Sequence, residues 1–500
     1  MTIHLSILLA LPLFGAVVGA IWGGRGGRWF ALGGSLLALG YAIVAVARFK
    51  SGDGLQFVTD ETWIAALGVH WKLGIDGLNL FLVLLTTVLF SACTLWAVLG
   101  KEDRPTLFYF WFGAAHSAVL GALLAQDLLL FVLFFDLMLV PFFFLTGMYG
   151  TTTRADRIRA ITKLFIYTLV GSLLMLAAAI ATAVLSKGDS SLSFVFSDLA
   201  ARGGLSSGSQ DWIFLFFAAA FLVKMPAFPL HGWMPDGYMS MPLPVLAVFS
   251  GVLSKVAAYG FLRVALPLFP EGAQRFQTLL LLIALASILY GSAMAFTTTQ
   301  TRLILGYSSI AQLGFIVLGI FSLRADGAQG ALLQTVNHGI VVAPAFFIVA
   351  LLAARVGGSE DLRDMGGLAF RAPVLAVMFL IVALANLAMP GSSNFAGEFL
   401  ILLGVFQAKA AIAVVAFTGV AMASVYTLRL FIRSMHNRVA SDAQSREMTL
   451  ADGLVLVPLV LCIIALALYP QLALDRSEPS VKATLGAQAT PALAATEVGR

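Results

Sequence analysis

The stretch "FLVKMPAFPLHGWMP", residues 221–235, decides the fold because it places a lysine and three prolines inside an apolar run. Lys224 is followed by prolines at 226, 229 and 235. Proline removes a backbone donor and clashes with the preceding helical turn, so a regular helix does not continue through this stretch. In a bilayer, such a break survives only where it is buried in protein or lines a wet cavity. The stretch therefore predicts an interrupted helix inside a membrane protein.

The composition of the whole chain agrees with that prediction. Of its 500 residues, 60% are hydrophobic and only 11% are charged, with a mean hydropathy of +0.96. A soluble protein of this length needs more surface charge, and apolar runs of about 20 residues recur along the chain. We predict an all-α polytopic membrane protein with about fourteen spans, near 5–24, 30–47, 76–99, 106–125, 127–149, 157–187, 212–232, 242–268, 276–298, 302–323, 329–354, 373–406, 410–436 and 452–470.

A second interruption lies in "ALANLAMPGSSNFAGEFLILLG", residues 383–404, where Pro390-Gly391 is followed by small polar residues. Interrupted helices at matching places, five spans apart, are typical of internally repeated transport folds. Spans 7 and 12 are therefore predicted to be broken members of two inverted five-helix repeats. The expected units are 1–105 with helices 1–3 and an outer hairpin, 106–270 and 271–437 with the repeats, 438–475 with helix 14, and 476–500 as a polar, disordered tail.

The loops predict the hairpin and the orientation. "LQFVTD" and "VHWKLGID", within 51–75, alternate apolar and polar residues and predict a hairpin on the membrane surface. Lys and Arg are about twice as frequent in one set of loops, which includes Arg154, Arg157 and Arg159, as in the alternate set. The positive-inside rule then places both termini outside, in a bacterial-type inner (cell) membrane.

Redox and nucleotide-binding motifs are missing from the sequence. Cys93 and Cys462 lie in separate apolar runs, and no CxxC, GxGxxG, Walker-type or HExxH pattern stands in a meaningful context. We therefore expect no metal, cofactor or redox chemistry in this chain, and no nucleic-acid partner.

Ionisable residues inside the spans are the candidates for function: His116, Asp136, Lys163, Lys224, Lys255, Arg263, His338 and Glu398. A charge at mid-membrane costs ~2.5–3.5 kcal/mol, so it normally faces the bundle interior and has a partner. Lys163 stands near a span end and can instead snorkel, Arg263 suits an anchor, and His338 can simply bridge helices. For Asp136, Lys224, Lys255 and Glu398 the alternative to function is a buried structural ion pair.

These residues suit proton transfer. Burial and a nearby opposite charge act on proton affinity in opposing directions. A Lys224–Asp136 pair that opens and closes would alternately release and hold a proton, and Lys255, His338 and Glu398 would extend the relay. His116 and Lys163 are weaker candidates for it.

Residues 70–475 resemble the antiporter-like subunits of respiratory complex I, the proton-pumping NADH:quinone oxidoreductase. The resemblance rests on "QDLLLFVLFFDLMLVP", "LFIYTLVGSLLML", "FLVKMPAFPLHGWMPDGY", "GVLSKVAAYGFLRVALPLFP", "GYSSIAQLGFIVLGIF", "VNHGIVVAPAFFIV" and "MPGSSNFAGEFLILLG". It implies a translocase subunit in which Lys224 is the central proton-transferring lysine, Lys255 and His338 connect, and Glu398 is terminal. It also implies that NADH, FMN, iron–sulfur clusters and quinone belong to partner subunits.

Glu398 distinguishes members within that family. Chains of the L and N type and the sodium/proton antiporter subunits generally carry lysine there, whereas the M type carries glutamate, so L- and N-type chains are the implied neighbours. Three positions depart from the family pattern: Asp136 replaces glutamate, His116 replaces an acid, and Gln312 replaces histidine. Gln312 cannot titrate and is not placed on the proton path. The competing interpretations are a multi-chain sodium/proton antiporter, a membrane-bound hydrogenase, and a structural membrane bundle.

Overall fold

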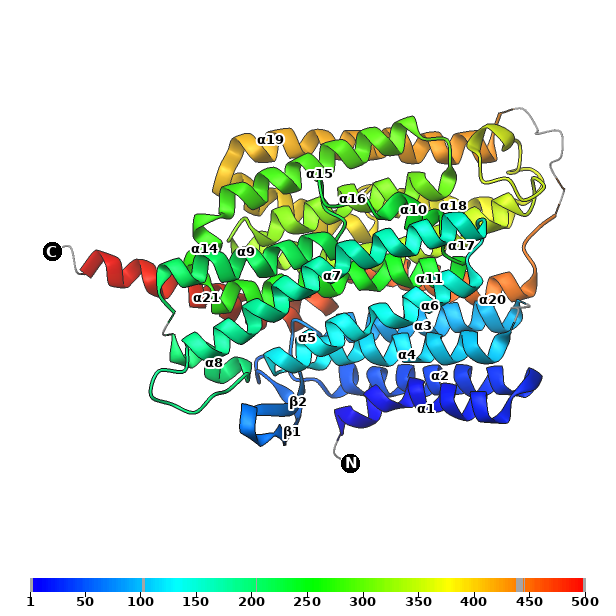
Figure 1. Cartoon of the computed structure of the whole chain (residues 1–500). Coiled ribbons are helices and arrows are strands. Elements are labelled where there is room, and N and C mark those ends of the chain that lie inside the picture. Colours follow the sequence, from blue (N-terminus) through cyan, green and yellow to red (C-terminus); the bar gives the residue numbers. More distant parts are fainter. Residues whose placement is uncertain (1–2, 101–103, 204, 438–443, 445, 498–500) are drawn as a thin grey trace.

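A computed structural model describes residues 3–100, 104–203, 205–437, 444 and 446–497. Within them, twelve helices are long and apolar enough to cross a membrane. The helices run roughly side by side, with α1 and α2 along one edge of the bundle and α19 along the other (Figure 1). The predicted all-helical membrane class is confirmed at this level. Parts of three predicted units lie outside the described residues: 438–443 and 445 of the helix-14 unit, 101–103 of the first unit, and 498–500 of the tail.

The N-terminal part holds the only sheet among the described residues. Its elements are α1 (Leu5–Trp22), α2 (Gly24–Arg48), β1 (Gln56–Ile64), η1 (Ala65–Leu67), β2 (Val69–Ile75) and α3 (Leu80–Leu99). β1 and β2 pair antiparallel, which confirms the predicted hairpin. Trp71 Nε1 donates to Ser6 Oγ over 3.0 Å, so the hairpin is fastened to the start of α1. α1 and α2 can pack closely because Gly19 has no side chain. A Cβ at Gly19 would stand only 2.3 Å from the Gly27 carbonyl oxygen.

The next part carries the first interruption. Its helices are α4 (Pro105–Leu124), α5 (Leu128–Leu137), α6 (Leu139–Tyr149), α7 (Arg154–Leu185), α8 (Phe196–Arg202), α9 (Ser207–Lys224), α10 (Met234–Ser240), α11 (Leu243–Val248), η2 (Phe249–Leu253), α12 (Ser254–Gly260), η3 (Phe261–Ala265), α13 (Leu266–Leu268) and α14 (Pro270–Arg275). Helix α9 ends at Lys224, one residue before the Met225-Pro226 pair. Trp233 Nε1 bonds the Val223 carbonyl over 3.0 Å, which satisfies an acceptor that the helix end leaves free.

The following part carries the second interruption. It contains α15 (Gln277–Thr297), α16 (Thr301–Ile320), α17 (Ala325–Ala353), η4 (Leu362–Asp364), α18 (Pro373–Asn386) and α19 (Ser393–Met435). The chain leaves helical geometry between Asn386 and Ser393, around Pro390 and Gly391. A further break lies inside α19 at Lys409, where φ is −149° and ψ is 81°. Helix α19 therefore consists of two helical parts joined by a bend.

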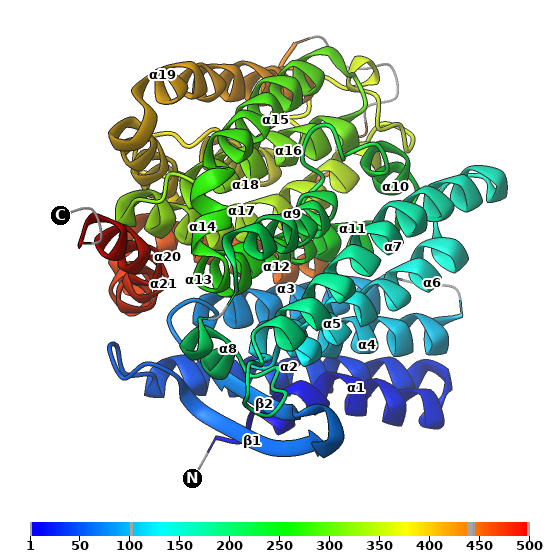
Figure 2. The same cartoon turned by 60° about the vertical axis from the view of Figure 1, so that its left-hand side comes forward.

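The C-terminal part corrects one prediction. After α20 (Leu450–Leu468), residues Gln471–Glu497 form helix α21, where a polar, disordered tail was predicted from 476. Ser477, Val481 and Thr484 recur along one face and are buried, and Gly77 N–H bonds Ser480 Oγ over 3.0 Å. Across 477–484 the predicted disorder is wrong, because small side chains at helical spacing dock on the bundle. Ser51 Oγ bonds the Asp475 carbonyl over 2.6 Å, so α21 begins at the hairpin end (Figure 2).

Candidate functional site

Lys224 lies at the last residue of α9 and is only 5% exposed. Its Nζ donates to the Phe135 carbonyl and stands 3.6 Å from the centroid of the Phe135 ring. A carbonyl and an aromatic face both favour the ammonium form. No ion pair joins Lys224 to an acid in the described part of the chain.

Asp136 lies near the end of α5, one residue after Phe135. Its Oδ1 accepts from Ser172 Oγ of α7 over 2.5 Å. The carboxyl also lines a largely apolar groove of about 910 Å³ between α5, α6 and α7. Lys224 and the Ser172 that bonds Asp136 lie against the same small gap, and no hydrogen bond or ion pair joins Lys224 to Asp136 among the described residues. The two residues of the predicted pair thus lie near each other but hold separate hydrogen-bond partners.

Lys255 lies in α12 between the π-helical segments η2 and η3, and it is 1% exposed. Its Nζ donates to the Ser250 carbonyl over 2.6 Å and to Ser254 Oγ over 3.3 Å. Segments of π-helix often mark functional sites. Lys255 is close enough to His338 of α17 for the two to interact electrostatically. Both ring nitrogens of His338 are buried without a hydrogen-bond partner among the described residues.

Glu398 lies in the first turns of α19 and is 3% exposed. Its Oε1 accepts from Gln312 Nε2 of α16 over 2.8 Å and from Gln334 Nε2 of α17 over 3.4 Å. Beyond it, Tyr426 shares a hydrogen bond with Ser308 over 3.0 Å. Glu398 is therefore surrounded by neutral polar groups rather than by a basic partner.

Two predicted candidates, His116 and Lys163, lie apart from the buried residues described above. His116 stacks on Phe90 with ring centroids 4.4 Å apart, and its Nδ1 is 3.4 Å from Ser35 Oγ, in the α2–α4 packing. Lys163 forms an ion pair with Asp236 at 2.5 Å, with side chains 46% and 39% exposed. These environments fit a packed core histidine and a surface ion pair.

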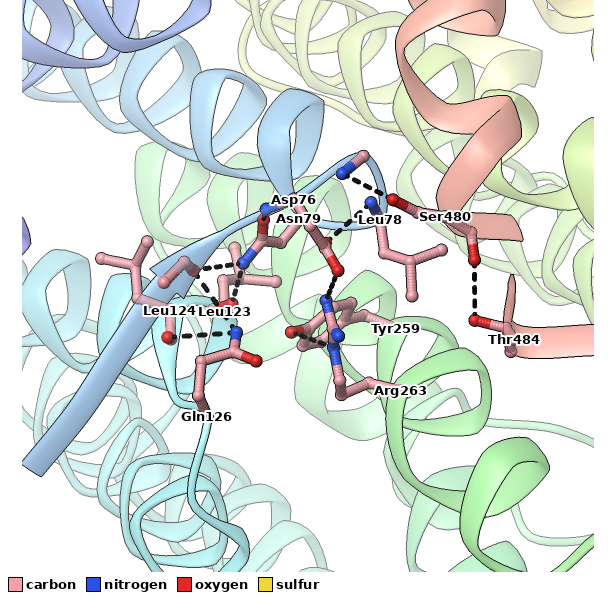
Figure 3. A network of polar contacts seen from close by, with 12 residues as sticks. Asp76, Leu78, Asn79, Leu123, Leu124, Gln126, Tyr259, Arg263, Ser480 and Thr484 are labelled. Carbon is pink, nitrogen blue, oxygen red and sulfur yellow. Dashed lines mark hydrogen bonds and ion pairs between the residues drawn. The ribbon is translucent and has the colours of Figure 1, made fainter. Parts of the chain in front are cut away.

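Arg263 belongs to a separate polar network at the hairpin end (Figure 3). Its Nη2 bonds Asp76 Oδ2 over 2.5 Å, and its Nε bonds the Tyr259 hydroxyl over 3.0 Å. Asn79 Nδ2 joins the same corner through the carbonyls of Gly74 and Leu123, at 2.9 and 2.8 Å. Arg263 thus has a structural ion-pair partner in Asp76.

Two acids outside the spans, Asp60 and Asp361, form ion pairs with nearby basic side chains. Burial acts to raise the pKa of Asp60, but hydrogen bonds from Lys72 and His70 outweigh it and hold that pKa below its usual value. Hydrogen bonds from Arg363 lower the pKa of Asp361 to about 2. No group of three His, Cys, Asp or Glu side chains that could hold a metal occurs within the described residues.

Sequence reasoning missed three contributors: Ser172, Gln334 and Asp76. Ser172 and Gln334 are polar residues within long apolar runs, and that signal was available but was applied only to ionisable groups. Asp76 stands at the end of β2, so its pairing with Arg263, 187 positions later, depends on the tertiary fold. Gln312 was set aside as unable to titrate, yet it directly contacts Glu398.

Comparison with known proteins decides the family. Residues 125–423 match the family model described as "NADH:quinone oxidoreductase/Mrp antiporter, TM". The chain belongs to this family. NADH-quinone oxidoreductase subunit M of Rhodobacter capsulatus is 34% identical, covering 95% of each chain, and the Escherichia coli K12 subunit M is 35% identical, covering 84% of each.

Solved structures agree with the membership. A chain of respiratory complex I from Thermus thermophilus superposes with a TM-score of 0.89 at 29% identity, covering 97% of this chain and 100% of that one. A chain of the Mrp complex from Dietzia gives 0.84 at 22% identity, covering 98% of this chain and 99% of that one, which shows a shared fold. This member of the family is thus a multi-pass membrane protein.

Proposed function

We propose that this chain is the M-type, proton-translocating subunit in the membrane arm of NADH:quinone oxidoreductase. The observation that carries the proposal is the burial of Lys224, Lys255 and Glu398, at 5%, 1% and 3% exposure, without ion-pair partners among the described residues. Permanently charged groups are costly in such places, whereas groups that gain and lose a proton need only be charged part of the time. Asp136 and His338 complete the relay.

The twelve apolar helices become fourteen spans with two changes. Helices α9 and α10 together add one span, and α19 counts as two spans because it bends at Lys409. The interruptions after Lys224 and before Glu398 then occupy matching positions in repeats 106–270 and 271–437, related by inversion. Both termini lie on the outer side, where the hairpin and α21 meet.

The partners supply the redox chemistry. In this proposal NADH, FMN, iron–sulfur clusters and quinone are bound by other subunits, and L- and N-type antiporter-like chains are the neighbours. The relatives named subunit M support this choice over an antiporter or hydrogenase subunit.

The proposal is tested with the purified complex in sealed vesicles. Lys255→Met should leave NADH-binding partners in the preparation but lower NADH-driven proton uptake at least tenfold. Lys482→Met is the matched control, because Lys482 is 63% exposed on α21 and pairs with Glu478. Normal uptake in Lys255→Met would support a purely structural bundle. Sodium-dependent exchange without NADH oxidation would favour the antiporter.

A further inference from the structure

Helices α17 and α19 approach each other closely beside Glu398. A Cβ on Gly397 would stand 2.6 Å from Gln334 Oε1 and 3.1 Å from Gln334 Cα. One turn away, a Cβ on Gly330 would stand 2.8 Å from the Gly397 carbonyl oxygen. Because these two glycines have no side chains, α17 and α19 approach closely enough to place Gln334 beside the Glu398 carboxyl.

The hydrogen bonds around Glu398 have a fixed direction. Gln334 Nε2 donates to Gln312 Oε1 over 2.8 Å. Since the oxygen of the Gln312 amide faces Gln334, its Nε2 faces Glu398 and donates to Glu398 Oε1. Gln334 Nε2 also reaches the same carboxyl oxygen at 3.4 Å. Both amides present donors to the carboxyl, an arrangement that suits the ionised acid because a carboxylate only accepts.

One acceptor in this cluster is unused. Gln334 Oε1 is buried and has no hydrogen-bond partner within the described residues. A protonated carboxyl carries an O–H that must donate, and a buried donor without an acceptor is costly. The same side chain that donates to the ionised Glu398 can therefore accept from the neutral one.

We propose that Gln312 and Gln334 form a two-amide clamp of positioning residues that serves both protonation states of Glu398. Gln312 and Gln334 donate to the carboxylate; when a proton binds Glu398, the new O–H donates to Gln334 Oε1. The clamp rests on the proposed role of Glu398 and adds the residues that control its proton exchange.

Charged neighbours do not compete with the clamp. Helices α15 and α18 contain no acidic, basic or histidine side chain. On α16, Arg302 is held by Glu360 at 2.5 Å, and on α20, Asp452 is held by the cap at Thr449. Tyr426 interacts electrostatically with Glu398, while His338 lies one turn beyond Gln334 on α17. The amides are thus the direct partners of the carboxyl.

The test measures NADH-driven proton uptake against pH for the assembled complex with Gln312→Leu or Gln334→Leu. Gln312→Leu removes the 2.8 Å donor to the carboxylate and so favours the neutral acid, which should move the alkaline limb up by about one pH unit. Gln334→Leu removes both a donor to the carboxylate at 3.4 Å and the acceptor of the neutral acid, so the limb should not move up and the rate should fall. The control is Gln329→Leu, on the same helix as Gln334, whose amide bonds Ser477 and the Leu474 carbonyl instead. Gln312→Asn, which keeps the amide but shortens it, should give a smaller shift.

Glu398→Gln separates this proposal from the function on which it rests. If Glu398→Gln pumps normally, the relay role of Glu398 fails and the clamp fails with it. If Glu398→Gln is inactive but Gln312→Leu keeps the control's pH profile or loses rate equally at every pH, or Gln334→Leu keeps the control's rate, only the clamp is overturned.

An infrared measurement needs no clamp variant. The band of the Glu398 carboxyl C=O is assigned as the one that disappears in Glu398→Gln. In the unmodified complex at acid pH, this band should lie at the position of a hydrogen-bonded carboxylic acid. A band at the position of a free acid would overturn the clamp even if Gln312→Leu and Gln334→Leu do not assemble.

Discussion

Two acid–base pairs in this molecule differ in whether the two side chains touch: one pair is closed by a direct ion pair, and the other is open. Arg263 and Asp76 meet at 2.5 Å, with side chains 14% and 10% exposed. Lys224 and Asp136 instead hold other partners, the Phe135 carbonyl and Ser172. A closed pair holds two opposite charges in contact and fastens elements together, whereas in the proposed relay an open pair leaves each group able to exchange its proton. The comparison separates structural charge from working charge.

The largest expected effect is on the open pair. Lys224→Ala removes the group that we propose takes up and releases the proton, so NADH-driven proton uptake should fall at least tenfold while the complex still assembles. Proton uptake in vesicles, normalised to NADH oxidation, measures this loss. Unchanged uptake would show that the open pair is as structural as the closed one.

Breaking the closed pair should act on stability. Arg263→Leu leaves Asp76 buried without its partner, and the expected cost is about 3–5 kcal/mol. Thermal unfolding of the purified complex measures it. The matched control is Lys163→Leu, which breaks the exposed pair with Asp236 and should cost about 0–1 kcal/mol. Equal losses in both variants would contradict the assigned roles.

Asp136 tests whether the acid of the open pair must ionise. Asp136→Asn keeps the size and the Ser172 contact but removes the charge, so proton uptake should fall several-fold. Asp136→Glu, which keeps the charge, should retain most of it. If the asparagine variant pumps like the parent chain, Asp136 is not a working member of the relay.

The smallest effect concerns the aromatic face under Lys224. Phe135→Leu removes a cation–π contact worth up to about 2 kcal/mol when desolvated, while the backbone carbonyl stays in place. The pH profile of pumping should move by about one unit toward acid, because the ammonium loses a stabilising contact. Phe131→Leu, in the same helix, is the control.

Much of this protein could be predicted from local sequence. The apolar runs, the alternating hairpin and the proline interruptions near 226 and 390 each depend on residues close together in the chain. Disorder was wrongly predicted for 477–484 because low hydropathy conceals that Ser477, Val481 and Thr484 fit small spaces on the bundle. Docking of that kind depends on a distant surface.

The sequence by itself determined which residues are costly to bury, because a charge in an apolar run is visible without a fold. Only the tertiary structure decided their partners: Ser172 for Asp136, the two amides for Glu398, and Asp76 for Arg263. The physical reason is that hydrogen bonds act over about 3 Å. Each partner lies 36 to 187 positions from the charged residue that it contacts, and the two meet only when the helices pack.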